Sequence, residues 1–243
     1  MDDMSIKKQC ALTVRSIYSL SSGHWLHGLG ILCCMYVALY FSGCSMVVLA
    51  GKVFMGDPKQ PAKFKMGTGT NLEKGKHRIL VVASAPYSAN LNGHALDLDI
   101  LDGVTRRIKR KGVKVVSSAK VSTWMDDNGG VFNDPDDLLE DFETDFIVHI
   151  AVESYSYLEE NSTSMYRGRC AGTVTVYEVV EDDDDQKKTV EVWSNGFSSL
   201  YPQAYPISHE QVTPELFQQR FTDRLNTQLA QLFYAHLASE AVE

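Results

Sequence analysis

The sequence predicts a mixed α/β domain of the α+β kind, in three layers, with about five strands and three helices. Three observations support this prediction. A buried strand, an amphipathic helix and a second strand follow one another near residue 78. Alternating apolar residues mark three later strands, and an apolar stripe marks a helix near the C-terminus. The predicted order, β-α-β-α-β-β-β-α, occupies residues 78–243.

Composition places the chain among globular proteins that do not bind nucleic acid. It has 243 residues, of which 44% are apolar and 22% are charged, and its net charge is −8. These proportions suit one folded domain with an appendage. Nucleic-acid binding requires basic stripes, which this acidic chain lacks, so we expect no nucleic-acid partner.

An uncharged apolar segment, Gly28–Gly51, precedes the predicted domain. As a helix it has a length of roughly 36 Å, enough to cross the apolar part of a bilayer. It contains Phe41-Ser42-Gly43-Cys44, in which small residues precede a cysteine near the end of an apolar run. This pattern is typical of bacterial lipoprotein signal peptides. We therefore expect residues 1–51 to be a leader, with cleavage after Gly43 and a lipid, such as palmitate, on Cys44.

Two other interpretations of the apolar segment remain open. The leader is long for a signal peptide, Phe41 replaces the more usual leucine, and apolar residues follow Cys44. An uncleaved single-pass anchor fits these departures, and the lysines after the segment would then place the domain in the cytoplasm. A buried helix of a soluble protein is the third interpretation. The first places the protein in the periplasm or on the outer membrane, whereas the second makes it a single-pass inner-membrane protein.

Residues 52–77 are rich in glycine, lysine, proline and threonine, so we expect a flexible linker there. The domain then opens with Arg78–Ala83, a short apolar run that predicts a buried strand. Apolar residues at helical spacing follow between residues 96 and 108, and Gly112 ends this helix before a strand at Val113–Val116. The basic residues at 106–111 suit either a phosphate site or, more simply, the C-terminal end of the helix dipole.

Residues 117–134 predict a polar loop, in which Asp126-Asp127-Asn128-Gly129-Gly130 resembles a calcium loop in composition only. Its spacing lacks the third alternate ligand, so a surface turn is the simpler interpretation. Asp134-Pro135 then predicts a helix start, with Asp134 as cap.

Alternation predicts strands at residues 145–155, 169–180 and 189–194, the last two joined by an acidic turn at 181–188. Thr213-Pro214-Glu215 predicts the start of the last helix, whose apolar stripe runs to about Leu237 and should cover the sheet.

No catalytic signature is present in the sequence, and we expect no cofactor and no metal. His209-Glu210 begins like a metalloprotease pair, but Thr213 stands where the second histidine belongs. His149, on a predicted strand, could be a base or a metal ligand, and Cys170 could be a nucleophile. Each could instead be a buried residue of the core. We expect a hydrogen-bonded core histidine and a small buried thiol.

The domain resembles a group of small α/β domains from bacterial envelope proteins. Three strings support the resemblance: Thr144–Val148, Gly172–Tyr177 and Lys188–Trp193. They are similar to strings in the curli-secretion lipoproteins (CsgG-like), the lipoprotein activators of penicillin-binding proteins (LpoB-like) and the N-terminal domain of TolB. The resemblance implies a non-catalytic domain that binds other envelope proteins or copies of itself, and it transfers no active-site residue. Pore formation is not implied, because the chain shows no evident pair of amphipathic membrane hairpins.

From the sequence we therefore expect a membrane-tethered envelope protein whose domain is an interaction module. Its membrane contact is a lipid or the apolar helix. The rival hypothesis is an anchored enzyme that uses His149, Cys170 or the Asp126-Asp127 loop. A calcium-dependent adhesion module is a third possibility. An enzyme should gather polar groups in an apolar cleft, whereas a binding module should have an exposed apolar patch or a free sheet edge.

Overall fold

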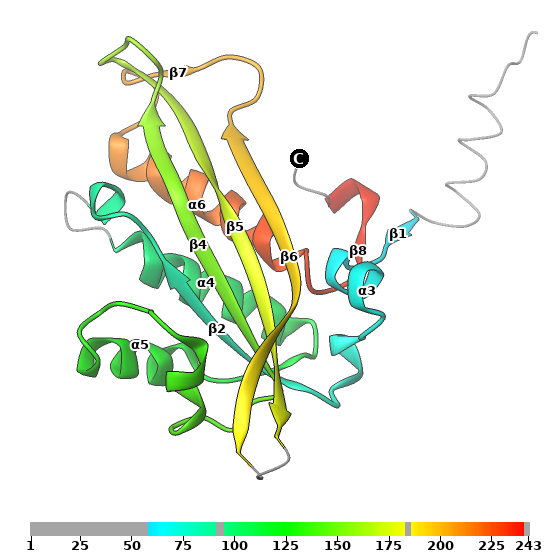
Figure 1. The fold of residues 1–243 in the computed structure, drawn as a ribbon. Coiled ribbons are helices and arrows are strands. Elements are labelled where there is room, and N and C mark those ends of the chain that lie inside the picture. Colours follow the sequence, from blue (N-terminus) through cyan, green and yellow to red (C-terminus); the bar gives the residue numbers. More distant parts are fainter. Residues whose placement is uncertain (1–57, 91–94, 183–185, 241–243) are drawn as a thin grey trace, which may run out of the picture. The chain divides into compact units, whose positions relative to one another are not determined.

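The computed structural model describes residues 58–90, 95–182 and 186–240, which form a mixed α/β domain (Figure 1). Its main sheet has the order β3-β2-β4-β5-β6, and β7 pairs with the start of β5. β3, β2 and β4 are parallel, whereas β5 is antiparallel to β4 and β6. The strands are β2 Arg78–Ser84, β3 Lys114–Val115, β4 Phe146–Leu158, β5 Met165–Glu181, β6 Lys187–Tyr201 and β7 Ile207–Ser208. The predicted fold class is confirmed.

Three main helices accompany the sheet, which is the predicted number: α4 Leu96–Arg110, α5 Ser118–Asp127 and α6 Pro214–Ala230. The middle one, α5, was not predicted, because we expected the second helix to begin at Asp134. A short helix, α3 Lys63–Thr68, precedes them. The 3₁₀ turns are η1 Leu72–Lys74, η2 Tyr87–Asn90, η3 Pro135–Leu139 and η4 Ala238–Glu240. A separate two-stranded ladder joins β1 Lys59–Gln60 to β8 His236–Leu237.

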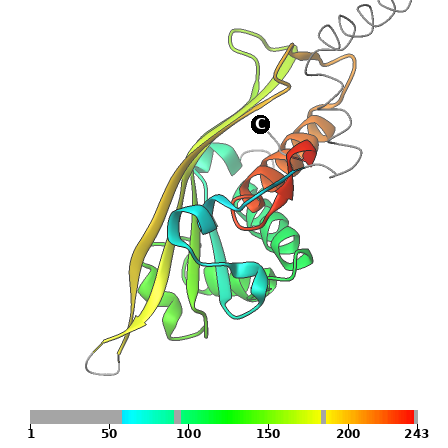
Figure 2. The same cartoon turned by 90° about the vertical axis from the view of Figure 1, so that its right-hand side faces the viewer.

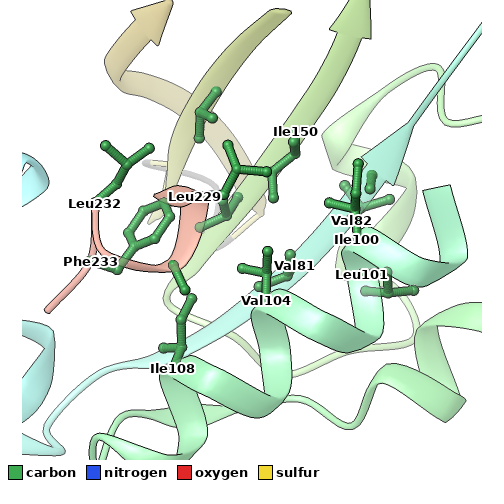
Figure 3. Packing of buried hydrophobic residues seen from close by; sticks show 14 of the residues in the cluster. Val81, Val82, Ile100, Leu101, Val104, Ile108, Ile150, Leu229, Leu232 and Phe233 are labelled. Carbon is green, nitrogen blue, oxygen red and sulfur yellow. The ribbon is translucent and has the colours of Figure 1, made fainter. Parts of the chain in front are cut away.

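The main core lies between one face of the sheet and the α4–α6 pair (Figure 2). In Figure 3, Ile100, Val104 and Ile108 of α4 lie beside Val81 of β2, with Leu229 of α6 close by. All five of these side chains are at most 1% exposed. Their helical spacing on α4 and α6 and their position on the sheet therefore produce one continuous apolar layer.

Among the described residues, cover on the opposite face of the sheet is confined to its parallel half. α5 packs against β2, and the ring of Phe132 lies 4.4 Å from the ring of His149 on β4. Every residue of β2 from Ile79 to Ala83 is buried, which requires cover on both faces. On β5 and β6, by contrast, the residues of this face are half-buried or exposed. The antiparallel half thus keeps one open face.

α5 occupies a segment in which we expected a polar loop. Val121 and Met125, four residues apart, are its buried residues, so its apolar stripe is too short to stand out in the sequence. The expected turn, Asp126–Gly130, is the exposed end of this helix. Asp134 does cap the next element, since its Oδ1 accepts the N–H of Asp136 at 3.0 Å, but that element is the 3₁₀ turn η3.

Residues 58–77 pack onto the domain, although we expected them to belong to the flexible linker. Phe64 of α3 is 1% exposed and its ring contacts Phe146, Trp193 and Phe233. Leu72 of η1 is also buried. The lysines and glycines around Phe64 and Leu72 are typical of a linker, so the composition of the segment did not indicate that these two side chains are buried in the domain.

The C-terminal helix is shorter than we expected. α6 begins at the predicted cap, where Thr213 Oγ1 accepts the N–H of Leu216 at 3.3 Å, and it ends at Ala230. Leu232 and Phe233 continue the apolar pattern in a turn that leads to β8. An apolar stripe therefore extends beyond the helix itself.

The predicted anchor Gly28–Gly51, the cleavage position Gly43 and the lipidation position Cys44 lie outside the described residues. Within the described ranges, none of the helices has the length and apolar character needed to span a bilayer.

The contact between α4 and α6 gives a stability prediction at Gly103. A Cβ there would lie 2.1 Å from Nδ2 of the buried Asn226, which donates to the carbonyl of Asp99. Gly103→Ala gains about 1 kcal/mol of helix propensity but overpacks this contact. We expect the free energy of unfolding to fall by about 1–3 kcal/mol, measured by urea denaturation.

The matched control is Leu98→Ala, an exposed position of the same helix that should change stability by less than about 0.5 kcal/mol. A Gly103→Ala protein more stable than the wild type would contradict the close packing of α4 on α6.

Candidate interaction surface

The long hairpin of β5 and β6 supplies the candidate surface, because β6 is the last strand of the sheet. β5 has 17 residues and β6 has 15, whereas typical strands have about five or six. Their register runs from Gly168 opposite Tyr201 to Glu181 opposite Lys187. One side of β6 is therefore fully paired, and its other side is an edge of the sheet.

Two side chains show which backbone groups of β6 point away from β5. The N–H of Thr189 donates to Asp136 Oδ1 at 2.8 Å, and the carbonyl of Ser198 accepts from Gln228 Nε2 at 2.9 Å. Because outward groups alternate along an antiparallel strand, Ser194, Gly196 and Leu200 face outward together with Ser198. η3 thus covers the first part of the edge, and the outward N–H groups of these four residues remain beyond it.

This open part of the edge lacks the usual protection against pairing. Trp193–Tyr201 contains neither a charged residue nor a proline, and Ser194, Gly196 and Ser198 are exposed. Natural edge strands commonly carry lysine, proline or a bulge that prevents another strand from adding. Here the bulge lies earlier, where Val176 and Tyr177 face β6 with a register shift. We call Trp193–Tyr201 the open edge.

A hollow of about 500 Å³ lies beside the open edge on the helix side of the sheet. Phe197 and Met66 contribute apolar surface, and Met66 is 62% exposed. Gln228 lines the hollow too; its buried Oε1 has no hydrogen-bond partner among the described residues. We call this space the edge hollow. Its lining is Gln60, Pro61, Lys63, Met66, Asn195, Gly196, Phe197, Ser198, Gln228, Leu229, Gln231, Leu232 and His236.

Sequence reasoning missed most of the open edge. We expected this strand to end at Ser194. The next two residues, Asn195-Gly196, form a dipeptide that is common in turns. The structure instead continues β6 to Tyr201. The alternation of Trp193, Phe197 and Tyr201 at even spacing was the available signal for that continuation.

His149 has a partner that the sequence did not indicate. Its Nε2 lies 2.9 Å from the hydroxyl oxygen of Ser84, which comes from the end of the neighbouring strand β2. Burial of the ring lowers the pKa of His149 from 6.5 to about 4. The imidazole is therefore neutral at pH 7. Neither residue lines the edge hollow, so this pair and the open edge are separate features.

Cys170 lies in the core, as we expected. It is 2% exposed, forms no disulfide, and burial raises the pKa of its thiol to about 12. A reactive cysteine needs a thiolate at neutral pH, which this environment opposes. The structure places Cys170 and His149 on opposite faces of the sheet: Cys170 on β5 faces α6, whereas His149 contacts Phe132.

The remaining candidates do not come together. Asp126 and Asp127 are exposed at the end of α5, and His209 bonds the carbonyl of Ser164 at 3.2 Å. Within residues 58–90, 95–182 and 186–240, no group of three or more His, Cys, Asp or Glu side chains is arranged to hold a metal ion.

Comparison with known proteins gives distant structural similarity only. No protein-family model matches the chain, and no curated protein matches it. The chain is similar to the lipoprotein GNA1162 from Neisseria meningitidis, at 17% identity over 62% of this chain and 94% of that chain, with a TM-score of 0.34. It is also similar to the PelC dodecamer from Paraburkholderia phytofirmans, at 12% identity over 73% of this chain and 96% of that chain, with a TM-score of 0.34. A third similar structure is the hypothetical protein CT253 from Chlamydia trachomatis, at 13% identity over 65% of this chain and 97% of that chain, with a TM-score of 0.40.

The lowered pKa of His149 predicts a dependence of stability on pH. Between pH 6.5 and pH 4 the unfolded chain binds a proton that the folded chain does not, so stability falls as the pH falls through this window. We expect the free energy of unfolding to drop by roughly 1–2 kcal/mol from pH 7 to pH 4.5 through this residue, after allowance for partial exposure.

His149→Gln should remove this part of the pH dependence, measured by urea denaturation at several pH values. His209→Gln, at an exposed histidine, is the control and should retain it. An unchanged pH profile in His149→Gln would show that the ring is not buried as described.

Proposed function

We propose that this protein is a membrane-tethered, non-catalytic interaction module of the bacterial cell envelope, and that it assembles by pairing the open edge of β6 with that of a second copy. The observation that supports this most directly is the run Trp193–Tyr201, an edge that is uncharged and free of proline and in which Ser194, Gly196 and Ser198 are exposed. Edges of this kind accept an added strand. Two copies related by a two-fold axis would join their sheets across this edge.

Backbone groups supply the attraction in this arrangement. The outward groups of Ser194, Gly196, Ser198 and Leu200 alternate along the edge, which is the pattern that an antiparallel partner strand requires. With Gly196 opposite Gly196 of the second copy, Ser194 would lie opposite Ser198, and no like charges would meet within the nine residues. Each hydrogen bond formed contributes about 0.5–1.5 kcal/mol.

The edge hollow supplies apolar contact for the same arrangement. An added strand directs alternate side chains to the helix side of the sheet, where Phe197 and the exposed Met66 lie. Covering these side chains stabilises association by about 25 cal/mol for each Å² of apolar surface removed from water. An N–H or hydroxyl group entering the hollow would also satisfy the unpartnered Oε1 of Gln228.

Self-association can be tested with two charges on the open edge. Ser194→Lys/Ser198→Lys places like charges opposite each other in an antiparallel pair, which is destabilising. We expect the wild type to sediment as a concentration-dependent dimer or larger assembly in analytical ultracentrifugation. The double variant should weaken association at least about tenfold, which corresponds to about 1.4 kcal/mol.

The matched control is Ser154→Lys/Ser156→Lys, two exposed positions on β4, an interior strand of the same sheet. It adds the same charge without touching the edge and should leave association unchanged. Two results would overturn pairing through β6. One is a wild type that stays monomeric at every protein concentration in the ultracentrifuge, and the other is an equal loss of association in the edge variant and the control variant.

The tether is proposed from the sequence, through Gly28–Gly51 and Cys44. We expect intact-mass analysis of the purified protein to show cleavage after Gly43 and a diacyl modification, both lost in Cys44→Ala. A full-length chain without lipid, still extracted with membranes, would instead favour the uncleaved anchor.

A membrane-anchored enzyme is the second candidate, favoured by the contact of 2.9 Å between Ser84 and His149. A neutral histidine beside a serine hydroxyl is the arrangement of a nucleophile and its base. Our proposal assigns this contact a structural role, since Phe132 packs on the ring. We therefore expect no labelling of the protein by a fluorophosphonate probe. Labelling that Ser84→Ala abolishes would establish the enzyme instead.

A further inference from the structure

A second hollow, of about 760 Å³, lies at the end of the sheet where β2 and β3 begin, and its lining is mainly basic. Its five cationic side chains come from five segments of the chain. They are Lys76 before β2, Arg78 on β2, Lys109 on α4, Lys114 on β3 and Lys187 on β6. Two carboxylates, Glu143 and Asp145, also line it. We call it the basic hollow; it gathers positive charge in a chain whose net charge is −8.

The fold forces two of these cations together. Arg78 and Lys114 are register partners on the parallel strands β2 and β3, so their Cα atoms are neighbours about 4.8 Å apart. Side chains of register partners lie on the same face of a sheet, and like charges in this position repel. An anion placed between them would convert this repulsion into attraction.

The five cations have no carboxylate partner among the described residues, which distinguishes them from the other basic groups. Elsewhere the structure pairs Arg106 with Asp102, Arg107 with Asp223, Arg167 and Arg169 with Glu159, and Lys188 with Asp182. These basic side chains form ion pairs with nearby carboxylates, whereas the five cations of the basic hollow form none with the described residues.

Asp145, one of the two acids in the basic hollow, already accepts a hydrogen bond from the backbone. Asp145 Oδ2 accepts the backbone N–H of Arg78 at 2.6 Å, and the neighbouring Thr144 hydroxyl donates to the carbonyl of Arg78 at 2.9 Å. These bonds join the start of β2 to the start of β4. The carboxylate of Asp145 thus accepts a backbone hydrogen bond and does little to neutralise the positive charge of the surrounding guanidinium and ammonium groups.

We propose that the basic hollow binds a multivalent anion of the phosphate class, presented by a phosphate ester or by the phosphodiester headgroup of a lipid. The guanidinium of Arg78 matches the geometry of phosphate oxygens, and the lysines add point charges. The volume is large enough for a diphosphate or a headgroup. Because Lys187 lies at the opposite end of β6 from the open edge, this site is independent of the pairing proposed above.

The site is tested by isothermal titration of the full-length protein, in uncharged detergent, with inorganic pyrophosphate and with dihexanoyl phosphatidylglycerol below its micelle concentration. The test variant is Arg78→Gln/Lys114→Gln. Each surface cation contributes roughly fivefold to the binding of an anionic surface, so the variant should bind roughly 25-fold more weakly. The control is Lys65→Gln/Lys120→Gln, two exposed lysines on α3 and α5 that line neither hollow and should not change this binding.

Each outcome of this titration decides the proposal. Binding of pyrophosphate, the lipid or both that weakens in the test variant alone supports it and identifies the source of the phosphate. Absence of binding by both probes overturns it, as does equal weakening in the control. Equal affinity for a hexa-aspartate peptide overturns the phosphate specificity. Circular dichroism confirms folding of the variants, and because both keep an intact β6 edge, their self-association reports separately on the proposed function.

Discussion

The alternation of side chains along β5 is the constraint on which the antiparallel half of this domain depends. Tyr166, Cys170, Val174 and Val176 face the helices and are at most 5% exposed, whereas the odd-numbered residues between them face the open side. Two glycines make this close packing possible. A Cβ at Gly168 would meet the ring of Phe221 at 2.5 Å, and one at Gly172 would meet the carbonyl of Ala151 at 2.1 Å. α6 and β4 can therefore approach β5 only because these positions carry no side chain.

The open edge follows from the same constraint. β5 pairs with β4 on one side and with β6 and β7 on the other, so β6 takes the outermost place. The helices pack on one face of this region. η3 and α3 contact β6 without adding a strand to it, although Asp136 of η3 accepts the N–H of Thr189. A long strand is thus fixed at the border of the sheet, and interaction by strand addition is the function that this arrangement supports best.

The sequence predicted the elements whose apolar pattern is long and regular. α4, α6 and the three long strands were found because many buried residues repeat the helical or strand period. α5 and α3 were missed because two and one buried residues, respectively, carry their packing. The candidate surface was missed for a different reason. Asn195-Gly196 indicates a turn locally, but the pairing with Val174 and Thr173 of β5 overrides that preference.

Contacts between residues that are distant in the chain could not be predicted from the sequence. Ser84 meets His149 only because β2 and β4 are adjacent, and the cations of the basic hollow meet only because β3 takes the outer place beside β2. The resemblance implied a class of domain, but it did not identify either surface. Function at these places therefore depends on topology, which brings together residues that are far apart in the sequence.

Hydrogen exchange of the outward amides of β6 directly reports pairing along the open edge. If two copies pair along the open edge, the N–H groups of Ser194, Gly196 and Ser198 are hydrogen-bonded in the assembly and exposed in the single chain. We expect their exchange to slow as protein concentration rises, while exchange of Ser154 and Ser156 on β4 stays constant. Equally fast exchange of the three amides at every concentration would contradict it.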